Sequence, residues 1–323
     1  MEYNARNAME WSRLSSRKVL GSVFCQLAQE KDFIVMVADV ASSTSLGDFV
    51  SQYPERFINV GIAETNMVAM ATGIAETGKN VFVMTFAPFA SMRCFEAVRT
   101  YVGYMNANVK IIGLASGLSM GVGGNTHFGL EDVSLMRTIP GMTVVSPADC
   151  TETVKTIEKA MDFRGPMYIR LTGVNGNPIV YKDDYDFAIG KGNILREGER
   201  TLIIACGMCV NECNRAAKVL SKEGITPTVV DMHTIKPLDE ELLHSLLKTH
   251  QNVVVAEEHT LIGGLGSAIS EFITKNNYKN NLKCIGLPDK FGPVANYGYL
   301  QEYYGLNAKS IAVTVSNFVK ENQ

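Results

Sequence analysis

The chain has 323 residues, 46% of them hydrophobic and 20% charged, and its 30 basic and 33 acidic side chains give a formal net charge of −3. This balance excludes a strongly basic nucleic-acid-binding protein, and no polybasic cluster points to an anionic membrane. The length is large for one hydrophobic core and suits two domains of about 150 residues each.

The composition also bears on location. Residues 1–18 contain Arg6, Arg13 and Arg17 but no apolar stretch, so we expect no signal peptide there. No run approaches about 18 uninterrupted apolar residues, which argues against a transmembrane helix. The seven cysteines lie mostly in apolar segments without a framework spacing, as is typical of reduced thiols. We therefore expect a cytoplasmic protein.

Short apolar runs alternate with helical patterns along the chain. In the first half we expect strands at 34–38, 81–85, 109–114, 143–146 and 167–171. In the second half we expect strands at 201–205, 228–231, 252–257 and 283–285. Continuous β-branched strands separated by helices predict an α/β protein with doubly wound, mainly parallel sheets that are covered on both faces.

Residues 173–200 break this rhythm with several glycines, Pro178 and a run of charge at 182–186. This composition is typical of a connection between domains. We therefore predict two α/β domains, at residues 1–175 and 199–323, joined by a linker at 176–198.

Cys206, Cys209 and Cys213 have a spacing that could hold a metal ion if a fourth ligand were present. However, 202–206 is typical of a buried strand and the residues from Met208 onward of the following helix. The three sulfur atoms are then not expected to converge. We interpret them as small core residues and predict no metal site in this chain.

Glu64 is a lone carboxylate in the apolar segment Gly61-Ile62-Ala63-Glu64-Thr65-Asn66-Met67. An acidic residue in the first turn of a helix is stabilised by the helix dipole, which needs no further function. A functional interpretation requires the carboxylate to be buried and to share a proton with a nitrogen atom of a ligand. The residues alone leave both interpretations open.

Phe86 and Phe89 follow an expected strand in the segment Met84-Thr85-Phe86-Ala87-Pro88-Phe89. Pro88 is acceptable at an early position of a helix. Aromatic residues at helical spacing usually belong to the core, but they could also form a wall against which a flat heterocycle stacks.

His127 ends the glycine-rich segment Gly121-Val122-Gly123-Gly124-Asn125-Thr126-His127. Glycines allow the backbone to approach a ligand closely. The segment lacks both the lysine of a phosphate-binding loop and the glycine pattern of a dinucleotide-binding loop. A lone histidine is often a loop residue whose hydrogen bonds are made within the protein. After a glycine-rich turn it is also a candidate for polar contact with a ligand.

Taken in order, these segments resemble the transketolase family. The resemblance extends to Ala38-Asp39-Val40-Ala41-Ser42-Ser43, to Ile139-Pro140-Gly141-Met142 and to Tyr168-Ile169-Arg170-Leu171. In the second half it includes His233-Thr234-Ile235-Lys236-Pro237 and Glu257-Glu258-His259 with Gly263-Gly264-Leu265-Gly266. It implies a pyrimidine-binding domain at 1–175 and a transketolase C-terminal domain at 199–323.

The resemblance implies a thiamine-diphosphate-dependent transferase that moves a two-carbon ketol unit from a ketose to an aldose. Glu64 would hydrogen-bond a ring nitrogen of the cofactor's aminopyrimidine and favour its reactive tautomer, and Phe86 and Phe89 would pack on that ring. His127 would act in catalysis and contact the sugar. Ser43 and Arg170 align with positions that bind the distal acidic group of the sugar.

The family also needs a domain that holds the diphosphate and its metal through a Gly-Asp-Gly motif, and Gly47-Asp48-Phe49 is not that motif. The resemblance therefore implies a split transketolase. In such an enzyme a separate N-terminal subunit would hold the diphosphate with Mg²⁺ or another divalent ion, most simply in an α2β2 heterotetramer.

Two positions depart from the family. Ala115 replaces a histidine that helps to bind substrate phosphate, and Gly123 replaces an aspartate that reads a hydroxyl group. Losing one charged hydrogen-bonding partner costs roughly 1–3 kcal/mol. One hypothesis is an unusual ketose, sulfonated or branched; the other is a remodelled pocket for ordinary sugar phosphates.

Two rival classes remain at this stage. A 2-oxoacid dehydrogenase β subunit shares the architecture and the glutamate, but it usually carries adjacent histidines where this chain has only His127. A non-catalytic α/β binding module or flavoprotein subunit would not need Glu64 together with His127.

Overall fold

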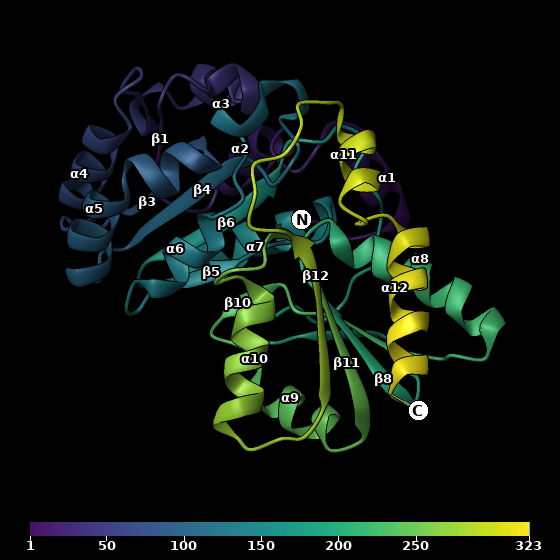
Figure 1. Ribbon diagram of the computed structural model, residues 1–323. Coiled ribbons are helices and arrows are strands. Elements are labelled where there is room, and N and C mark those ends of the chain that lie inside the picture. The colour runs from purple at the N-terminus through teal and green to yellow at the C-terminus, as the bar shows by residue number, and fades with distance from the viewer. Residues whose placement is uncertain (323) are drawn as a thin grey trace.

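The computed structural model describes residues 1–322 and contains two open sheets with helices on their faces (Figure 1). The strands are β1 Phe33–Val37, β2 Phe57–Asn59, β3 Asn80–Phe86, β4 Val109–Ser116, β5 Thr143–Val145, β6 Met167–Thr172, β7 Asn193–Arg196, β8 Arg200–Ala205, β9 Thr228–Asp231, β10 Thr234–Lys236, β11 His250–Thr260 and β12 Asn281–Leu287.

Helices connect most of these strands. They are α1 Ala5–Leu14, α2 Leu20–Leu27, α3 Gly47–Gln52, α4 Glu64–Ala75, α5 Phe95–Ala97, α6 Asp132–Thr138, α7 Cys150–Asp162, α8 Cys209–Leu220, α9 Glu240–Leu247, α10 Leu265–Lys275, α11 Tyr297–Tyr303 and α12 Ala308–Glu321. Phe89–Arg93 and Val98–Tyr104 are π-helical, and Ala41–Thr44, Pro54–Arg56, Gly121–Thr126 and Ser221–Glu223 form 3-10 turns.

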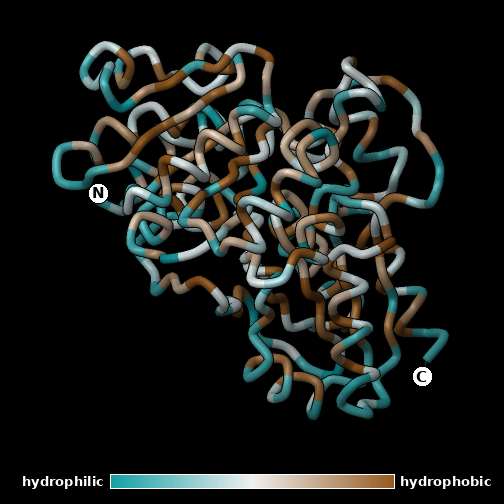
Figure 2. Tube along the Cα trace, turned by 90° about the vertical axis from the view of Figure 1, so that its left-hand side faces the viewer, coloured by the Kyte–Doolittle hydropathy of each residue, from teal (hydrophilic) through white to brown (hydrophobic). Residues whose placement is uncertain are grey.

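The first sheet has seven strands in the order β10-β5-β6-β4-β3-β1-β2, and all its neighbours are parallel except β10 and β5. Successive side chains of a strand point to opposite faces of the sheet. In the central strands both sets are buried, because helices cover both faces. Val81 and Val83 pack with α4 and the π-helical segments, whereas Phe82 and Met84 pack with α2 and α7. Figure 2 shows that many segments inside the fold are hydrophobic, while hydrophilic segments are common at its rim.

The second sheet has five strands in the order β12-β11-β8-β9-β7, and only β7 runs antiparallel to its neighbour. Leu202 and Ile204 face the cluster that includes residues of α9 and α10, and Ile203 and Ala205 face the cluster that includes residues of α8 and α12. The predicted α/β fold with mainly parallel sheets is therefore confirmed.

All nine expected strands are present with small shifts at their ends, but three short strands were not expected: β2, β7 and β10. β7 lies inside the segment that the sequence assigns to the linker, because its pattern is too short and too polar to indicate a strand. β10 belongs to the C-terminal half of the chain, yet it pairs with β5 of the first sheet. The two halves therefore share a sheet as well as a connection.

A buried group of carboxyl side chains joins the connecting segment to both halves. The hydroxyl of Tyr181 donates to Asp231 Oδ2 at 2.8 Å, and that of Tyr185 donates to Glu152 Oε1 at 2.9 Å. Burial raises the pKa of Glu152 well above its usual value, and it raises the pKa of Asp231 to about 7. Both carboxyl groups therefore take up a proton at higher pH than exposed carboxyl groups do.

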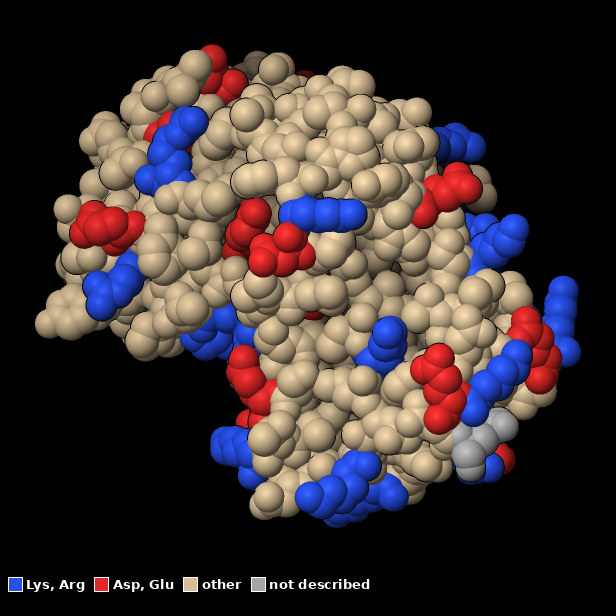
Figure 3. All heavy atoms as spheres, in the orientation of Figure 1, with Lys and Arg blue, Asp and Glu red and all other residues tan. Residues whose placement is uncertain are grey.

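Acidic and basic side chains are interspersed on the face shown in Figure 3, and neither sign forms a continuous stripe there. Within residues 1–322, every helix is too short or too polar to cross a membrane.

Candidate active site

The candidate residues lie near the carboxyl ends of the parallel strands of the first sheet. Ser43 follows β1, Phe86 ends β3, His127 follows β4, and Arg170 is in β6. Parallel strands bring their carboxyl ends to one edge of a sheet, and this edge is where ligands of open α/β sheets bind.

Glu64 is the first residue of α4, and its side chain is only 4% exposed. The helix dipole favours a negative charge at this position. One carboxylate oxygen, Oε1, accepts a hydrogen bond of 2.7 Å from Nη1 of Arg93, whose side chain is 48% exposed. Glu64 is therefore buried, as a functional carboxylate must be. The Arg93 guanidinium is the cation that contacts it.

The three rings of Phe86, Phe89 and His127 come together in one aromatic wall. The ring centroids of Phe86 and Phe89 are 6.0 Å apart, and that of His127 lies 5.5 Å from Phe89 and 6.4 Å from Phe86, all in edge-on arrangements. Phe86, Phe89 and His127 are all partly exposed, so the cluster is a wall of a site and not only core.

The π-helical turn Phe89–Arg93 determines how the wall meets the carboxylate. Single π-helical turns are rare and occur often at functional sites. Here the turn places the Arg93 guanidinium over the Phe89 ring, with Cζ 4.1 Å from the ring centroid, while the same guanidinium contacts Glu64. Glu64 and Phe89 are therefore linked through one side chain.

The glycine-rich loop before His127 packs against the chain's own C-terminal half. A Cβ atom at Gly121 would lie 3.1 Å from Ala295 O, and one at Gly124 would lie 2.7 Å from Val294 Cγ2. Both glycines also have positive φ angles, 50° and 66°. The close approach that these glycines permit is therefore to a protein segment and not to a ligand, which fixes the loop that ends at His127.

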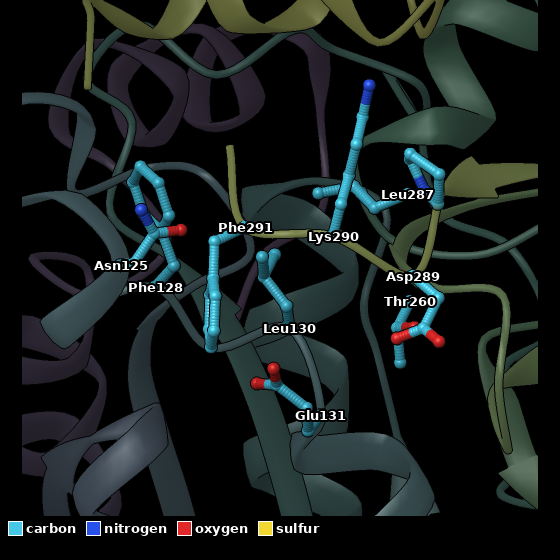
Figure 4. A pocket seen from close by; sticks show the side chains of 10 residues that line it. Asn125, Phe128, Leu130, Glu131, Thr260, Leu287, Asp289, Lys290 and Phe291 are labelled. Carbon is cyan, nitrogen blue, oxygen red and sulfur yellow. The ribbon is translucent and has the colours of Figure 1, made fainter. Parts of the chain in front are cut away.

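A cavity of about 290 Å³ lies beside this loop (Figure 4). Asn125, Leu130 and Glu131 line it from one segment, and Lys290 and Phe291 line it from the other. The Asn125 side chain also holds the second segment through hydrogen bonds with the backbone of Gly292, at 2.9 Å to O and 3.3 Å from N.

The contacts of Ser43 and Arg170 are with residues other than those of the aromatic wall. Ser43 is partly exposed in the 3-10 turn after β1. Arg170 is only 6% exposed and is held by protein groups: its Nε donates to both oxygens of Asp132, at 3.1 and 2.9 Å. Its Nη2 donates to the carbonyl oxygens of Gly129 and Glu258. Substrate binding by these two residues stays a prediction, and the contacts of Arg170 favour a structural role.

Sequence reasoning missed Arg93, although it lies one helical turn after Phe89. That spacing was the available signal, because side chains four residues apart share a face of a helix. It also missed Asp132 as the partner of Arg170, and no local pattern connects these two residues, which are 38 positions apart.

The comparison with known proteins supplies the context for this geometry. Residues 12–177 match the family described as transketolase, pyrimidine binding domain, and residues 190–311 match transketolase, C-terminal domain. The chain is 41% identical to a 6-deoxy-6-sulfo-D-fructose transketolase subunit, SqwH, of a Clostridium species, over 88% of both chains. It is 36% identical to an apulose-4-phosphate transketolase subunit of Phocaeicola vulgatus, over 95% of this chain and 98% of that one.

A solved structure of a split-gene transketolase, described as an inactive β4 tetramer, superposes with a TM-score of 0.84 at 38% identity, over 95% of this chain and 98% of that one. The chain belongs to the transketolase family and comprises its pyrimidine-binding and C-terminal domains. More particularly, it is a transferase subunit of the split type, and the chemistry of this family depends on thiamine diphosphate.

The residues present fit the aminopyrimidine end of that cofactor. A planar nitrogen heterocycle needs an aromatic wall and a carboxylate that can bind a ring nitrogen, and Phe89 and Glu64 offer both. A planar nitrogen group of the chain itself, the Arg93 guanidinium, already makes both contacts. Within residues 1–322, no group of three or more His, Cys, Asp or Glu side chains is arranged to hold a metal ion.

Proposed function

We propose that this chain transfers a two-carbon ketol unit from a ketose to an aldose, with Glu64 as the residue that activates thiamine diphosphate. The observation that carries this proposal is the buried Glu64 carboxylate at the start of α4, which the Arg93 guanidinium links to the Phe89 ring of the aromatic wall. A buried carboxylate needs a partner. Arg93 supplies one in this structure, and a ring nitrogen of a ligand can make the same contact.

Each residue of the cluster has a distinct task in this proposal. Glu64 would bind a ring nitrogen through a charge-assisted hydrogen bond, which contributes roughly 1.5–3 kcal/mol. Phe89, braced by Phe86, would orient the ring and exclude water from one of its faces. Thiamine diphosphate, when bound, supplies the carbanion that accepts the ketol unit.

His127 would contact the sugar hydroxyls and the two-carbon unit as it is transferred. Its Nδ1 lies 2.9 Å from Thr126 Oγ1, and its ring packs edge-on against Phe89. The hydroxyl contact leaves Nε2 for a ligand. Ser43 and Arg170 are the further candidates for contact with the distal end of the sugar.

A second subunit would complete the site. We assign the diphosphate and its Mg²⁺ or similar divalent ion to an N-terminal, diphosphate-binding subunit, because the aromatic wall and Glu64 serve only the pyrimidine end of the cofactor. We propose that two such subunits assemble with two copies of this chain in the cytoplasm. The split-gene relative is described as inactive in its β4 form, which supports the need for a second kind of subunit.

The substrate end of the site differs from that expected for ordinary sugar phosphates. Ala115 is fully buried with a φ angle of 51° and offers no polar side chain. At Gly123, a Cβ atom would lie 3.3 Å from His127 Cβ, so a larger residue would crowd the histidine. The sulfofructose and apulose phosphate relatives act on unusual ketoses, which supports a sulfonated or branched donor for this chain.

The test is ketol transfer by the chain reconstituted with its diphosphate-binding subunit, thiamine diphosphate and Mg²⁺. Fructose 6-phosphate, 6-deoxy-6-sulfofructose and apulose 4-phosphate are offered as donors, with a 2-oxoacid as the competing substrate class. Glu64→Gln should reduce kcat by about 10²- to 10⁴-fold. Glu76→Gln, at the exposed C-terminal end of the same helix, should leave kcat unchanged.

Full activity of Glu64→Gln would sink the role of this residue. Decarboxylation of the 2-oxoacid without ketol transfer would sink the proposed reaction. A strong preference for fructose 6-phosphate would leave the reaction in place and overturn the unusual donor.

A further inference from the structure

Arg93 contacts both the Glu64 carboxylate and the Phe89 ring. Its Nη1 donates to Glu64 Oε1 at 2.7 Å, and its guanidinium carbon lies 4.1 Å from the centroid of the Phe89 ring. The guanidinium is planar, carries N–H donors and stacks on aromatic faces. It therefore binds a carboxylate and an aromatic face at the same time.

In the proposed function, the aminopyrimidine makes the same two contacts, with Glu64 and with Phe89. A ring stacked on Phe89 would lie in the layer that the guanidinium fills, since stacked groups approach to about 3.5–4 Å. A ring nitrogen bound to Glu64 would also need access to a carboxylate that is only 4% exposed beneath Arg93. Two planar groups cannot occupy this place together.

We propose that Arg93 stands in for the aminopyrimidine in the free subunit and is displaced when thiamine diphosphate binds. The inference rests on the proposed function, because it takes Glu64 and Phe89 as the pyrimidine site. In the free subunit the guanidinium compensates the buried carboxylate, which would otherwise be an unpaired charge.

The side chain can leave this position at low cost. It is 48% exposed, and its long stem ends beside solvent. The guanidinium regains water when it leaves, and the incoming ring nitrogen replaces it as the partner of the buried Glu64 carboxylate. Displacement is therefore reversible, and it acts as competition within the chain: the apparent dissociation constant of the cofactor is the intrinsic value divided by the fraction of subunits with an open site.

The contact predicts the effect of removing the competitor. Arg93→Met keeps an apolar stem beside Phe89 but cannot donate to Glu64. The reconstituted assembly should then bind thiamine diphosphate about 3- to 10-fold more tightly than wild type. Arg93→Lys keeps a charge without the planar group, so its dissociation constant should fall between the other two. Arg99→Met, at another exposed arginine of the following turn, should match wild type.

Binding is measured by isothermal titration calorimetry with saturating Mg²⁺, after thermal melting shows that each variant is folded. A second measurement uses the full chain alone and a free aminopyrimidine, 4-amino-5-hydroxymethyl-2-methylpyrimidine, followed by ligand-observed NMR. The fragment should bind Arg93→Ala more tightly than wild type, and binding should be lost in Arg93→Ala with Glu64→Gln.

Unchanged or weaker cofactor binding by both Arg93→Met and Arg93→Lys would overturn displacement, because it would mean that Arg93 stays at Glu64 in the holoenzyme. If wild type and all variants bind no thiamine diphosphate, the proposed function itself fails. The two failures are therefore distinguishable.

Discussion

Replacing Arg170 by Met tests whether this residue holds the domains together or binds substrate. The side chain reaches from β6 to both oxygens of Asp132 and to the backbone carbonyl of Glu258 in the C-terminal half. Arg170 is 6% exposed and Asp132 is fully buried. The substitution removes the only guanidinium in this contact and leaves the stem largely in place.

The magnitude follows from what remains behind. Asp132 keeps one hydrogen bond, from the Tyr168 hydroxyl at 2.7 Å, but loses its countercharge in a fully buried position. Breaking a buried pair by removing one partner costs roughly 3–5 kcal/mol. The carbonyl oxygens of Gly129 and Glu258 also lose a donor, at roughly 1 kcal/mol each. We therefore expect Arg170→Met to lower the free energy of unfolding by at least about 3 kcal/mol.

The assay is urea denaturation followed by circular dichroism, with Arg170→Met, Asp132→Asn and the double variant compared in a mutant cycle. Arg6→Met is the matched control, because Arg6 pairs with Glu10 on the surface, where the two side chains are 85% and 57% exposed, and it should cost under about 1 kcal/mol. A loss below about 1 kcal/mol for Arg170→Met, combined with a raised KM for the ketose, would refute the structural role and restore substrate binding.

Two further predictions concern stability. Asp231 has its pKa raised to about 7 by burial, so its contribution is complete below about pH 4 and is lost as the pH rises through about 7. In the wild type, the unfolding free energy should fall with rising pH over this range, and Asp231→Asn should make this fall less steep by up to ~1.4 kcal/mol per pH unit. Urea titrations from about pH 4 to 8 measure both slopes. Parallel curves for variant and wild type would contradict the prediction. At Gly264 a Cβ atom would lie 2.1 Å from Glu257 Oε2, which caps the start of α10. Gly264→Ala should therefore cost about 1–3 kcal/mol, whereas Gly73→Ala, which meets no atom within 4 Å, should be neutral or stabilising; equal thermal melting of the two variants would show the clash to be absent.

The elements that depend on the local pattern of apolar and polar residues could be predicted from the sequence. β3, β4 and β6 are mostly apolar runs buried on both faces, and such runs between helical segments have few alternatives in α/β proteins. Glu64 could be placed at the start of a helix because an acidic residue precedes an apolar helical pattern there.

The remaining features depend on contacts between distant residues. β10 is a three-residue strand whose partner, β5, lies about 90 residues earlier in the chain, and no periodicity indicates such a pairing. The partner of Arg170 could not be read from its own segment either. The family resemblance suggests a substrate contact for Arg170, and the fold adds Asp132 as a partner of its Nε atom; the substrate contact stays a prediction.

The pairing of β10 with β5 also limits how this chain can be divided. A polypeptide that ended within residues 178–192 would lack β10. It would leave β5 paired only with β6, with its other edge unpaired at the rim of the sheet. An exposed strand edge invites association with other chains. The separated halves would thus be poor building blocks for chimeric enzymes, and exchange with relatives should move β10 together with the pyrimidine-binding half.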